Sequence, residues 1–335
     1  MSTSIREEFR LRKFGLGYCD PDTFVKTQCR LPACVYFLWR LFWFVWHVAW
    51  IIGSGINSRL NKARDPDEGP KWFIYLTNTT LLLTTLTCTV DFLIILYLTV
   101  RRTASVIDNP TSDLAPRPVK NDEIIFRGEM MLMDGLKEFT TPWYLKLSWF
   151  LYNVVGSTNI LVTIMYWTVE FNGSTDVVVV VVHTINTVFI ISNLLLTAMP
   201  WQILHFIYPV LYAALYFLFT YIYYAAGGTD FKGRPYIYST VDWSKAYPTA
   251  VYVSLGVLVA VPIVHIVLFA VYTFRIFLFS KLNSATYSTQ VTGASSSAHH
   301  QTRVDGARSS FHHETEMTSR SRSDQDEELM TSPIH

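Results

Sequence analysis

The sequence predicts an all-α integral membrane protein, a six-transmembrane helical bundle with a disordered C-terminal tail. Half of the 335 residues are apolar and only 16% are charged, whereas a soluble domain carries about 25% charged residues. The charged residues are nearly absent from several long apolar runs and gather in the segments between them. A chain that passes repeatedly between lipid and water has this pattern.

The apolar runs are long enough for helices that cross a membrane, because one crossing takes about 20 residues. They lack the period-2 alternation of lipid-facing barrel strands, so helices are expected. The long apolar stretch that begins at Val177 is divided by Pro200, which predicts a tight helical hairpin. The predicted spans are residues 34–56, 73–99, 143–169, 177–199, 203–226 and 249–279.

Composition divides the chain into three regions. Residues 1–32 contain no apolar stretch of signal-peptide length, so we expect the first span to act as its own anchor. Residues 33–282 form the predicted membrane domain. Residues 283–335 are rich in Ser, Thr, His and charged residues, and they hold too little apolar surface to order themselves.

The distribution of Lys and Arg predicts that both termini are cytoplasmic. We expect the protein to lie in the plasma membrane or an endomembrane. With the N-terminus inside, the segments near the membrane carry thirteen Lys and Arg on the inner side and seven on the outer side. Cytoplasmic loops hold the excess of such residues. The sequon that begins at Asn172 then falls in an outer loop, which agrees with this orientation.

Several classes of chemistry have no motif in this chain. It has no phosphate-binding Gly-rich loop and no CxxC, HExxH or GxSxG motif, so we predict neither cofactor nor metal. The basic residues flank the spans, which indicates contact with anionic lipid in the bilayer and no binding of nucleic acid.

Polar side chains inside spans are costly, and each is a functional hypothesis. Thr77 in the second span and His183 in the fourth lie at matching depths, about 7 to 11 Å past the start of each span at 1.5 Å per residue. Polar groups at equal depth in neighbouring helices can meet. Asp91 lies about 21 Å beyond Thr77 and therefore belongs to another layer.

A hydroxyl beside an imidazole is the minimum for nucleophilic acyl transfer, in which Thr77 would attack and His183 would carry the proton. Asn186 and Asp176 are the candidates to orient His183. Two structural readings stay open, because membrane threonines commonly bond to their own helix and a membrane histidine often joins two helices. We expect His265 to be such an interhelical partner, and Arg40 either to be another or to extend toward the headgroups.

Three stretches carry a resemblance to a known family. They are Lys-Trp-Phe-Ile-Tyr-Leu-Thr-Asn at residues 71–78, Tyr-Ala-Ala-Gly-Gly-Thr at 224–229, and Ile237-Tyr238 with Val-Asp-Trp at 241–243. The sequence resembles the rolling stone family of multi-pass membrane proteins over about residues 20–280. This resemblance implies a role in cell fusion, because the family is implicated in myoblast fusion in flies.

A more distant similarity is to the androgen-induced membrane hydrolases, which cleave fatty acid esters of hydroxy fatty acids (FAHFA) with a Thr and a His. Leu76-Thr77 and His183-Thr184 match the positions of that pair, so the resemblance implies catalytic roles for Thr77 and His183. The sequence departs from these hydrolases in the four valines before His183 and in a longer loop after the second span.

Two functions follow from these observations. The first is intramembrane hydrolysis of a lipid ester, with fatty-acyl esters as substrates. The second is a non-catalytic role in cell (myoblast) fusion or adhesion, with protein partners at cell contacts. A transporter ranks last, because no paired Gly- or Pro-broken spans mark an inverted repeat.

Overall fold

The computed structural model describes residues 8–18, 21–28, 31–61, 70–108, 141–171, 173, 177–245 and 247–282. The predicted tail, residues 283–335, lies outside the described residues, and the division of the chain into three regions stays a prediction. The chain forms two compact units, residues 1–274 and 275–335. The helical bundle described below lies in the first unit up to residue 274 of its last helix.

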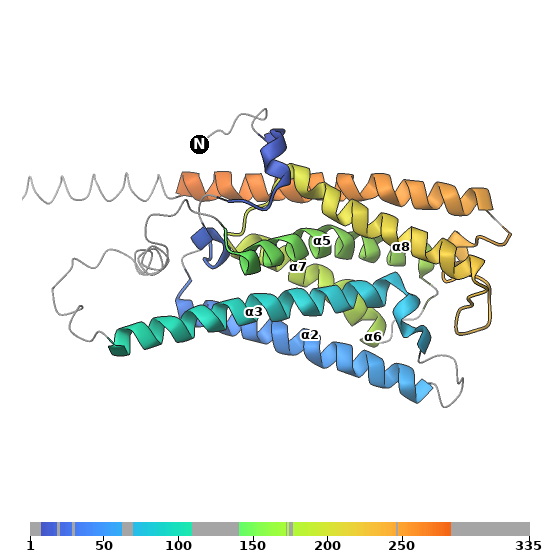
Figure 1. Cartoon of the computed structure of the whole chain (residues 1–335), viewed down its shortest axis with the longest axis horizontal. Helices are drawn as coiled ribbons and strands as arrows, with labels where there is room; N and C mark the ends of the chain where they lie inside the picture. The colour runs from blue at the N-terminus through green and yellow to red at the C-terminus, as the bar shows by residue number, and fades with distance from the viewer. Residues whose placement is uncertain are drawn as a thin grey trace, which may run out of the picture. The chain divides into compact units, whose positions relative to one another are not determined.

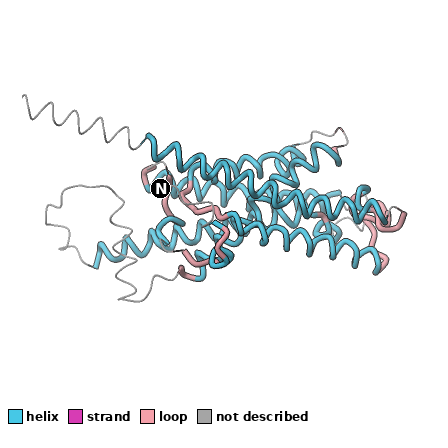
Figure 2. Tube along the Cα trace, turned by 90° about the horizontal axis from the view of Figure 1, so that it is seen from above, coloured by secondary structure: helices cyan, strands magenta, loops and turns pink. Residues whose placement is uncertain are grey.

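Within the described residues, six helices are long and apolar enough to cross a membrane, which confirms the predicted fold class. The only pairing of strand type in this part of the chain is one isolated bridge. The helices are α2 (Ala33–Asn61), α3 (Leu76–Asp108), α5 (Trp143–Met165), α6 and α7 (Val177–Val180 and Asn186–Leu196), α8 (Ile207–Ala225) and a last helix, Tyr247–Leu282. Figures 1 and 2 show them running along a common direction.

Two of the spans contain a π-helical turn, which the sequence pattern does not predict. Helix α5 continues into the turn η4 (Tyr166–Glu170), and the turn η5 (Val181–Ile185) joins α6 to α7. A π turn inserts one residue into the helical ladder and so redirects the side chains that follow; such turns occur frequently at functional sites.

Helix α5 is the central helix of the bundle. It contacts α3, α7 and α8. In its most apolar segment 72% of the residues are buried inside the protein, whereas the corresponding share for α2 is 22%. Large apolar side chains elsewhere point outward, as expected of a surface that lipid covers. Examples are Leu38, Phe42, Leu215, Val259 and Ile263.

The core beside α5 depends on one glycine. A Cβ at Gly156 would lie 2.5 Å from Cη2 of Trp201, closer than side-chain atoms tolerate. Trp201 is buried, and its ring contacts those of Tyr152 and His265. Glycine at position 156 therefore lets the residues that follow α7 pack directly on the central helix.

The N-terminal segment folds against one end of the bundle, which we call the amino-terminal end. Thr27 forms an antiparallel bridge with Thr197, supported by hydrogen bonds from Gln28 N to Leu196 O and from Ala198 N to Lys26 O, both 2.9 Å. Phe24 is buried and packs edge-on against Trp149 at 5.2 Å. Figure 1 shows this segment in dark blue.

Of the two readings of Arg40, the interhelical contact is confirmed and the extension toward the headgroups is wrong. Arg40 is buried and pairs with Asp91 of α3, with Nη1 2.7 Å from Oδ2. Its Nε and Nη2 donate to the Tyr36 hydroxyl at 3.0 and 2.8 Å, and the Ser148 hydroxyl donates to Asp91 Oδ1 at 2.5 Å. Within a membrane a buried counter-charge satisfies an arginine without contact with water.

Candidate functional site

A pocket opens near the other end of the bundle, which we call the loop end because residues 70–75, 166–171 and 227–245 lie there (Figure 1). Counted together with the open solvent at its mouth, the space inside measures about 590 Å³. Its walls come from α3, α5, η4, α8, the loop 227–245 and the last helix. The lining residues are Leu76, Thr77, Leu161, Val162, Met165, Tyr166, Glu170, Tyr216, Phe217, Tyr238, Thr240, Val241, Val253 and Val257.

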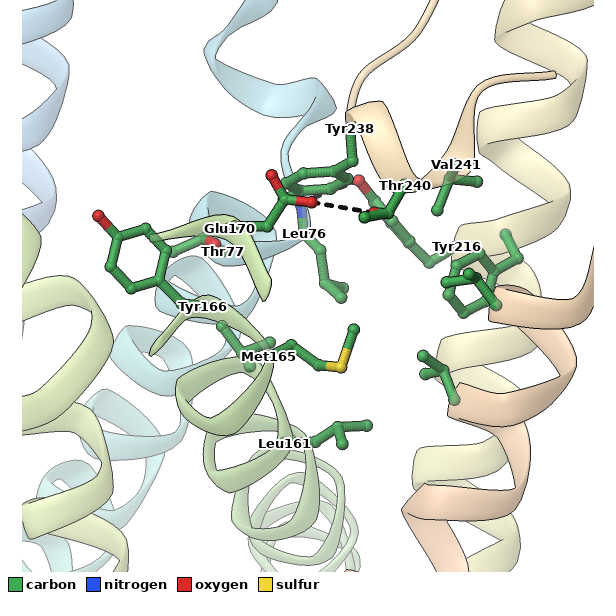
Figure 3. A pocket seen from close by; sticks show the side chains of 14 residues that line it. Leu76, Thr77, Leu161, Met165, Tyr166, Glu170, Tyr216, Tyr238, Thr240 and Val241 are labelled. Carbon is green, nitrogen blue, oxygen red and sulfur yellow. Dashed lines mark hydrogen bonds between the residues drawn. The ribbon is translucent and has the colours of Figure 1, made fainter. Parts of the chain in front are cut away.

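The pocket is polar at one end and apolar at the other. Figure 3 shows Glu170, Tyr238 and Thr240 gathered at one end, with Met165 and Leu161 farther from them. This arrangement matches a molecule that has a polar group and a hydrocarbon chain.

Thr77 stands in the first turn of α3 and lines this pocket. Because the first N–H groups of a helix have no partner within it, the start of α3 needs outside acceptors. The Tyr216 hydroxyl accepts from Leu76 N at 3.0 Å and donates to Ile74 O at 2.9 Å. The Tyr238 hydroxyl interacts electrostatically with Thr77, without a hydrogen bond described between the two.

The loop that carries Tyr238 is held in place by an internal ion pair. The Asp230 carboxylate accepts from Lys232 N at 2.9 Å and from Arg234 N at 2.8 Å, and it pairs with the Arg234 side chain at 2.6 Å. The hydrogen bond with Asp230 raises the pKa of Arg234. Lys71, just before α3, donates to Thr229 Oγ1 at 3.0 Å.

Burial at this end affects the tyrosines of the loop. Desolvation raises the pKa of Tyr238 and of Tyr75 above the ordinary value for a phenol. The two rings contact each other edge-on at 5.9 Å. Both hydroxyls therefore stay neutral at physiological pH.

Glu170 ends the π turn η4, and its carboxylate faces the pocket (Figure 3). Its Oε1 accepts from the Thr240 hydroxyl at 2.9 Å. Among the described residues, no Lys or Arg nitrogen lies within 4.0 Å of this carboxylate, and Oε2 has no hydrogen-bond donor.

His183 lies one side chain away from the pocket. Its ring stacks on that of Tyr166, with centroids 3.5 Å apart and an angle of 7°, and Tyr166 lines the pocket whereas His183 does not. The His183 carbonyl accepts from the Thr163 hydroxyl. In the part of the chain that the structure describes, its buried Nδ1 has no hydrogen-bond partner.

The structure thus brings Thr77 and His183 to the same neighbourhood without a described hydrogen bond between them. Thr77 lies close enough to Tyr238 to interact with it electrostatically, and the Tyr166 ring covers His183. Catalysis by this pair stays a prediction, and its geometry requires a movement of Tyr166.

Of the two residues predicted to orient His183, the structure describes only Asn186. Asn186 donates to Val182 O in its own helix at 2.9 Å, and its side chain interacts electrostatically with His47 of α2 without hydrogen-bond geometry between the two. Asp176 lies outside the described residues.

A second hydroxyl–imidazole pair occurs at the bundle core. Ser157 Oγ lies 2.9 Å from His265 Nδ1, and His265 Nε2 lies 2.9 Å from the Gln202 carbonyl oxygen. Because a carbonyl only accepts, Nε2 carries the proton and the serine donates to Nδ1. Neither side chain has any exposed surface, so this pair joins helices, as expected for His265, and meets no substrate.

Sequence reasoning missed Glu170, Tyr166, Tyr216 and Tyr238. Tyr238 belongs to a stretch that resembles the rolling stone family, and Glu170 is the one acidic residue between Lys146 and Asp176. Either feature could have marked its residue as a candidate for the site. Among the described residues, no group of three His, Cys, Asp or Glu side chains is close enough to hold a metal ion.

Comparison with known proteins places this fold in a family. The family model described as "Protein rolling stone" matches residues 127–294, half of the chain. The chain belongs to the rolling stone family. It is 26% identical to Protein rolling stone of Drosophila melanogaster over 301 residues, which cover 87% of this chain and 96% of that protein. No solved structure matches.

Membership of the rolling stone family and six apolar helices together make this a multi-pass membrane protein. The pocket includes residues inside the matched region, such as Glu170 and Tyr238, and residues before it, such as Thr77. The comparisons do not show the similarity to androgen-induced hydrolases, which stays a hypothesis.

Proposed function

We propose that this rolling stone family member binds the chain of a fatty-acyl ester in the pocket at the loop end and hydrolyses the ester with Thr77 and His183. The observation that supports the proposal is the position of Thr77: its side chain lines a pocket whose remaining walls are mostly apolar. Thr77 stands in the first turn of α3 beside Tyr238, so the helix fixes its backbone at the pocket wall, as a positioned nucleophile requires.

In the proposed reaction, the Thr77 oxygen attacks the ester carbonyl carbon while its proton passes to His183. The imidazolium then protonates the leaving alcohol as the carbon–oxygen bond breaks. Water, deprotonated by the same imidazole, releases the fatty acid from the acyl-threonine. Because Tyr166 stacks on His183, its ring must turn away when an acyl chain enters.

The test is covalent labelling of the purified full chain with a fluorophosphonate probe. We expect Thr77→Ala and His183→Ala to lose the label and Thr77→Ser to keep it. Thr79→Ala is the matched control, because Thr79 occupies the same turn but donates to Leu76 O and does not line the pocket. Equal labelling of wild type and Thr77→Ala would contradict the proposal.

The alternative, a non-catalytic role in cell fusion or adhesion, draws support from the folded loop 227–245. Its ion pair and the hydrogen bond from Lys71 give it a defined surface, which a protein partner could contact if this end faces outward, as the sequence predicts. In a cell-mixing assay, this role predicts normal fusion by Thr77→Ala and loss of fusion by Asp230→Ala. The opposite result would exclude it.

A further inference from the structure

The polar end of the pocket has a charge that the proposed function does not use. Glu170 is the only Asp, Glu, Lys or Arg among the fourteen residues that line the pocket. One of its oxygens accepts from Thr240, and the other has no donor among the described residues. A carboxylate in this position attracts a cation and repels an anion.

The aromatic side chains around Glu170 have the same preference. Tyr166, Tyr216 and Tyr238 line the pocket together with Glu170. The faces of aromatic rings carry negative charge density and attract ammonium groups, above all quaternary ones. A carboxylate combined with several rings and no lining cation is the composition of a site for a positively charged headgroup.

The apolar end indicates what is attached to that headgroup. Leu161, Met165, Val253 and Val257 line it, and they offer contact only to hydrocarbon. We propose that the pocket selects amphiphiles in which one acyl chain is joined to a cationic, ammonium-type headgroup, and that Glu170 makes the selection. The inference rests on the proposed function where it places the ester bond near Thr77, but it does not require hydrolysis.

The experiment measures binding to the full-length chain in phosphatidylcholine nanodiscs, in the Thr77→Ala background so that no ester is consumed. Three competitors displace radiolabelled palmitoylcholine: palmitoylcholine itself, methyl palmitate and palmitoyl glycolate. They share the chain and the ester bond, and their headgroups are cationic, neutral and anionic. We expect the cationic ester to bind about tenfold more tightly than the anionic one, with the neutral ester between them.

Two variants assign that preference to Glu170. Glu170→Gln keeps the shape and the acceptor for Thr240 and should reduce the preference to within about twofold, because it removes only the charge. Asp242→Asn is the matched control: Asp242 lies on the same loop as Thr240, accepts from Ser244 at 2.6 Å and does not line the pocket. It should leave the preference unchanged.

A third variant shows whether the ester binds in the pocket. Leu161→Trp fills the apolar end and should abolish binding of all three esters, whereas partition into the lipid would be unaffected. Equal binding of the cationic and anionic esters overturns the inference, as does a full preference in folded Glu170→Gln or an equal loss in Asp242→Asn. If Glu170→Gln does not fold, Glu170→Asp must retain the preference.

The outcome separates this inference from the proposed hydrolysis. Charge selection by Glu170 without fluorophosphonate labelling of Thr77 would identify a binding protein for cationic amphiphiles. Labelling of Thr77 without charge selection would support the proposed hydrolysis and contradict the preference for a cationic headgroup.

Discussion

Removing one partner of the buried ion pair should destabilise the bundle more than any surface change. In Arg40→Met, the methionine occupies similar space, but Asp91 keeps only its bond from Ser148. Three hydrogen bonds of Arg40 disappear, at 2.7, 2.8 and 3.0 Å. An uncompensated charge in a buried site costs about 3–5 kcal/mol.

The melting temperature in detergent measures this cost. With a shift of about 2–4 °C per kcal/mol for a large domain, Arg40→Met should melt roughly 10 °C below wild type. The double variant Arg40→Met with Asp91→Leu removes both charges and should recover most of that loss, because replacing a whole pair by apolar groups is close to neutral.

Arg101→Met is the matched control for the lost arginine. Arg101 lies in α3 but is exposed, and it donates to the Tyr97 hydroxyl at 3.0 Å; its removal should leave the melting temperature nearly unchanged. The reasoning is refuted if Arg40→Met melts with wild type, or if the double variant is no more stable than the single one.

Three further predictions concern packing, the start of α3 and the loop. Gly156→Ala should cost about 1–3 kcal/mol of unfolding free energy by overpacking against Trp201, seen as a lower melting temperature, and Trp201→Phe in the same chain should relieve part of it. Tyr216→Phe should cost about 1–3 kcal/mol, because Leu76 N and Ile74 O lose their partner, and hydrogen exchange at the start of α3 should rise. Burial would raise the pKa of Asp242, but hydrogen bonds from Ser244 outweigh it and lower the pKa. The ionised Asp242 carboxylate therefore stabilises the fold fully above its unfolded pKa of about 3.9, and this stabilisation is lost as the pH falls below that value. Hydrogen exchange of the loop should increase at acid pH in wild type and show no such increase in Asp242→Asn.

The six helices could be predicted because continuous apolarity fixes their length and, in lipid, leaves the backbone no alternative to a helix. The pairing of Arg40 with Asp91 could not, because the two residues stand 51 positions apart and each alone suits more than one environment. Burial of Phe24 and Val25 by the N-terminal segment is equally non-local. It encloses the end of the bundle toward which Arg40 was expected to extend.

The candidate site was predictable in depth but not in orientation. Rise per residue placed Thr77 and His183 in one layer, and the structure links them through Tyr166, which lines the pocket beside Thr77 and stacks on His183. The π turns at Tyr166–Glu170 and Val181–Ile185 rotate the side chains away from the faces that 100° per residue assigns. No residue pattern in either turn predicts this rotation of the side chains.

The Arg40–Asp91 ion pair and the polar groups at the pocket differ in how completely their atoms are hydrogen-bonded. In the ion pair, Arg40 uses all three nitrogens and Asp91 both oxygens, as a structural network must when unsatisfied polar groups cost free energy. At the pocket, Glu170 Oε2 and His183 Nδ1 have no partner among the described residues. Because His183 Nδ1 is buried, its missing partner costs free energy unless a ligand or a reaction uses the atom. Glu170 lies at the pocket, and His183 lies one ring away from it. A ligand with a positive headgroup would satisfy the carboxylate, and its entry would displace the ring that now covers the imidazole.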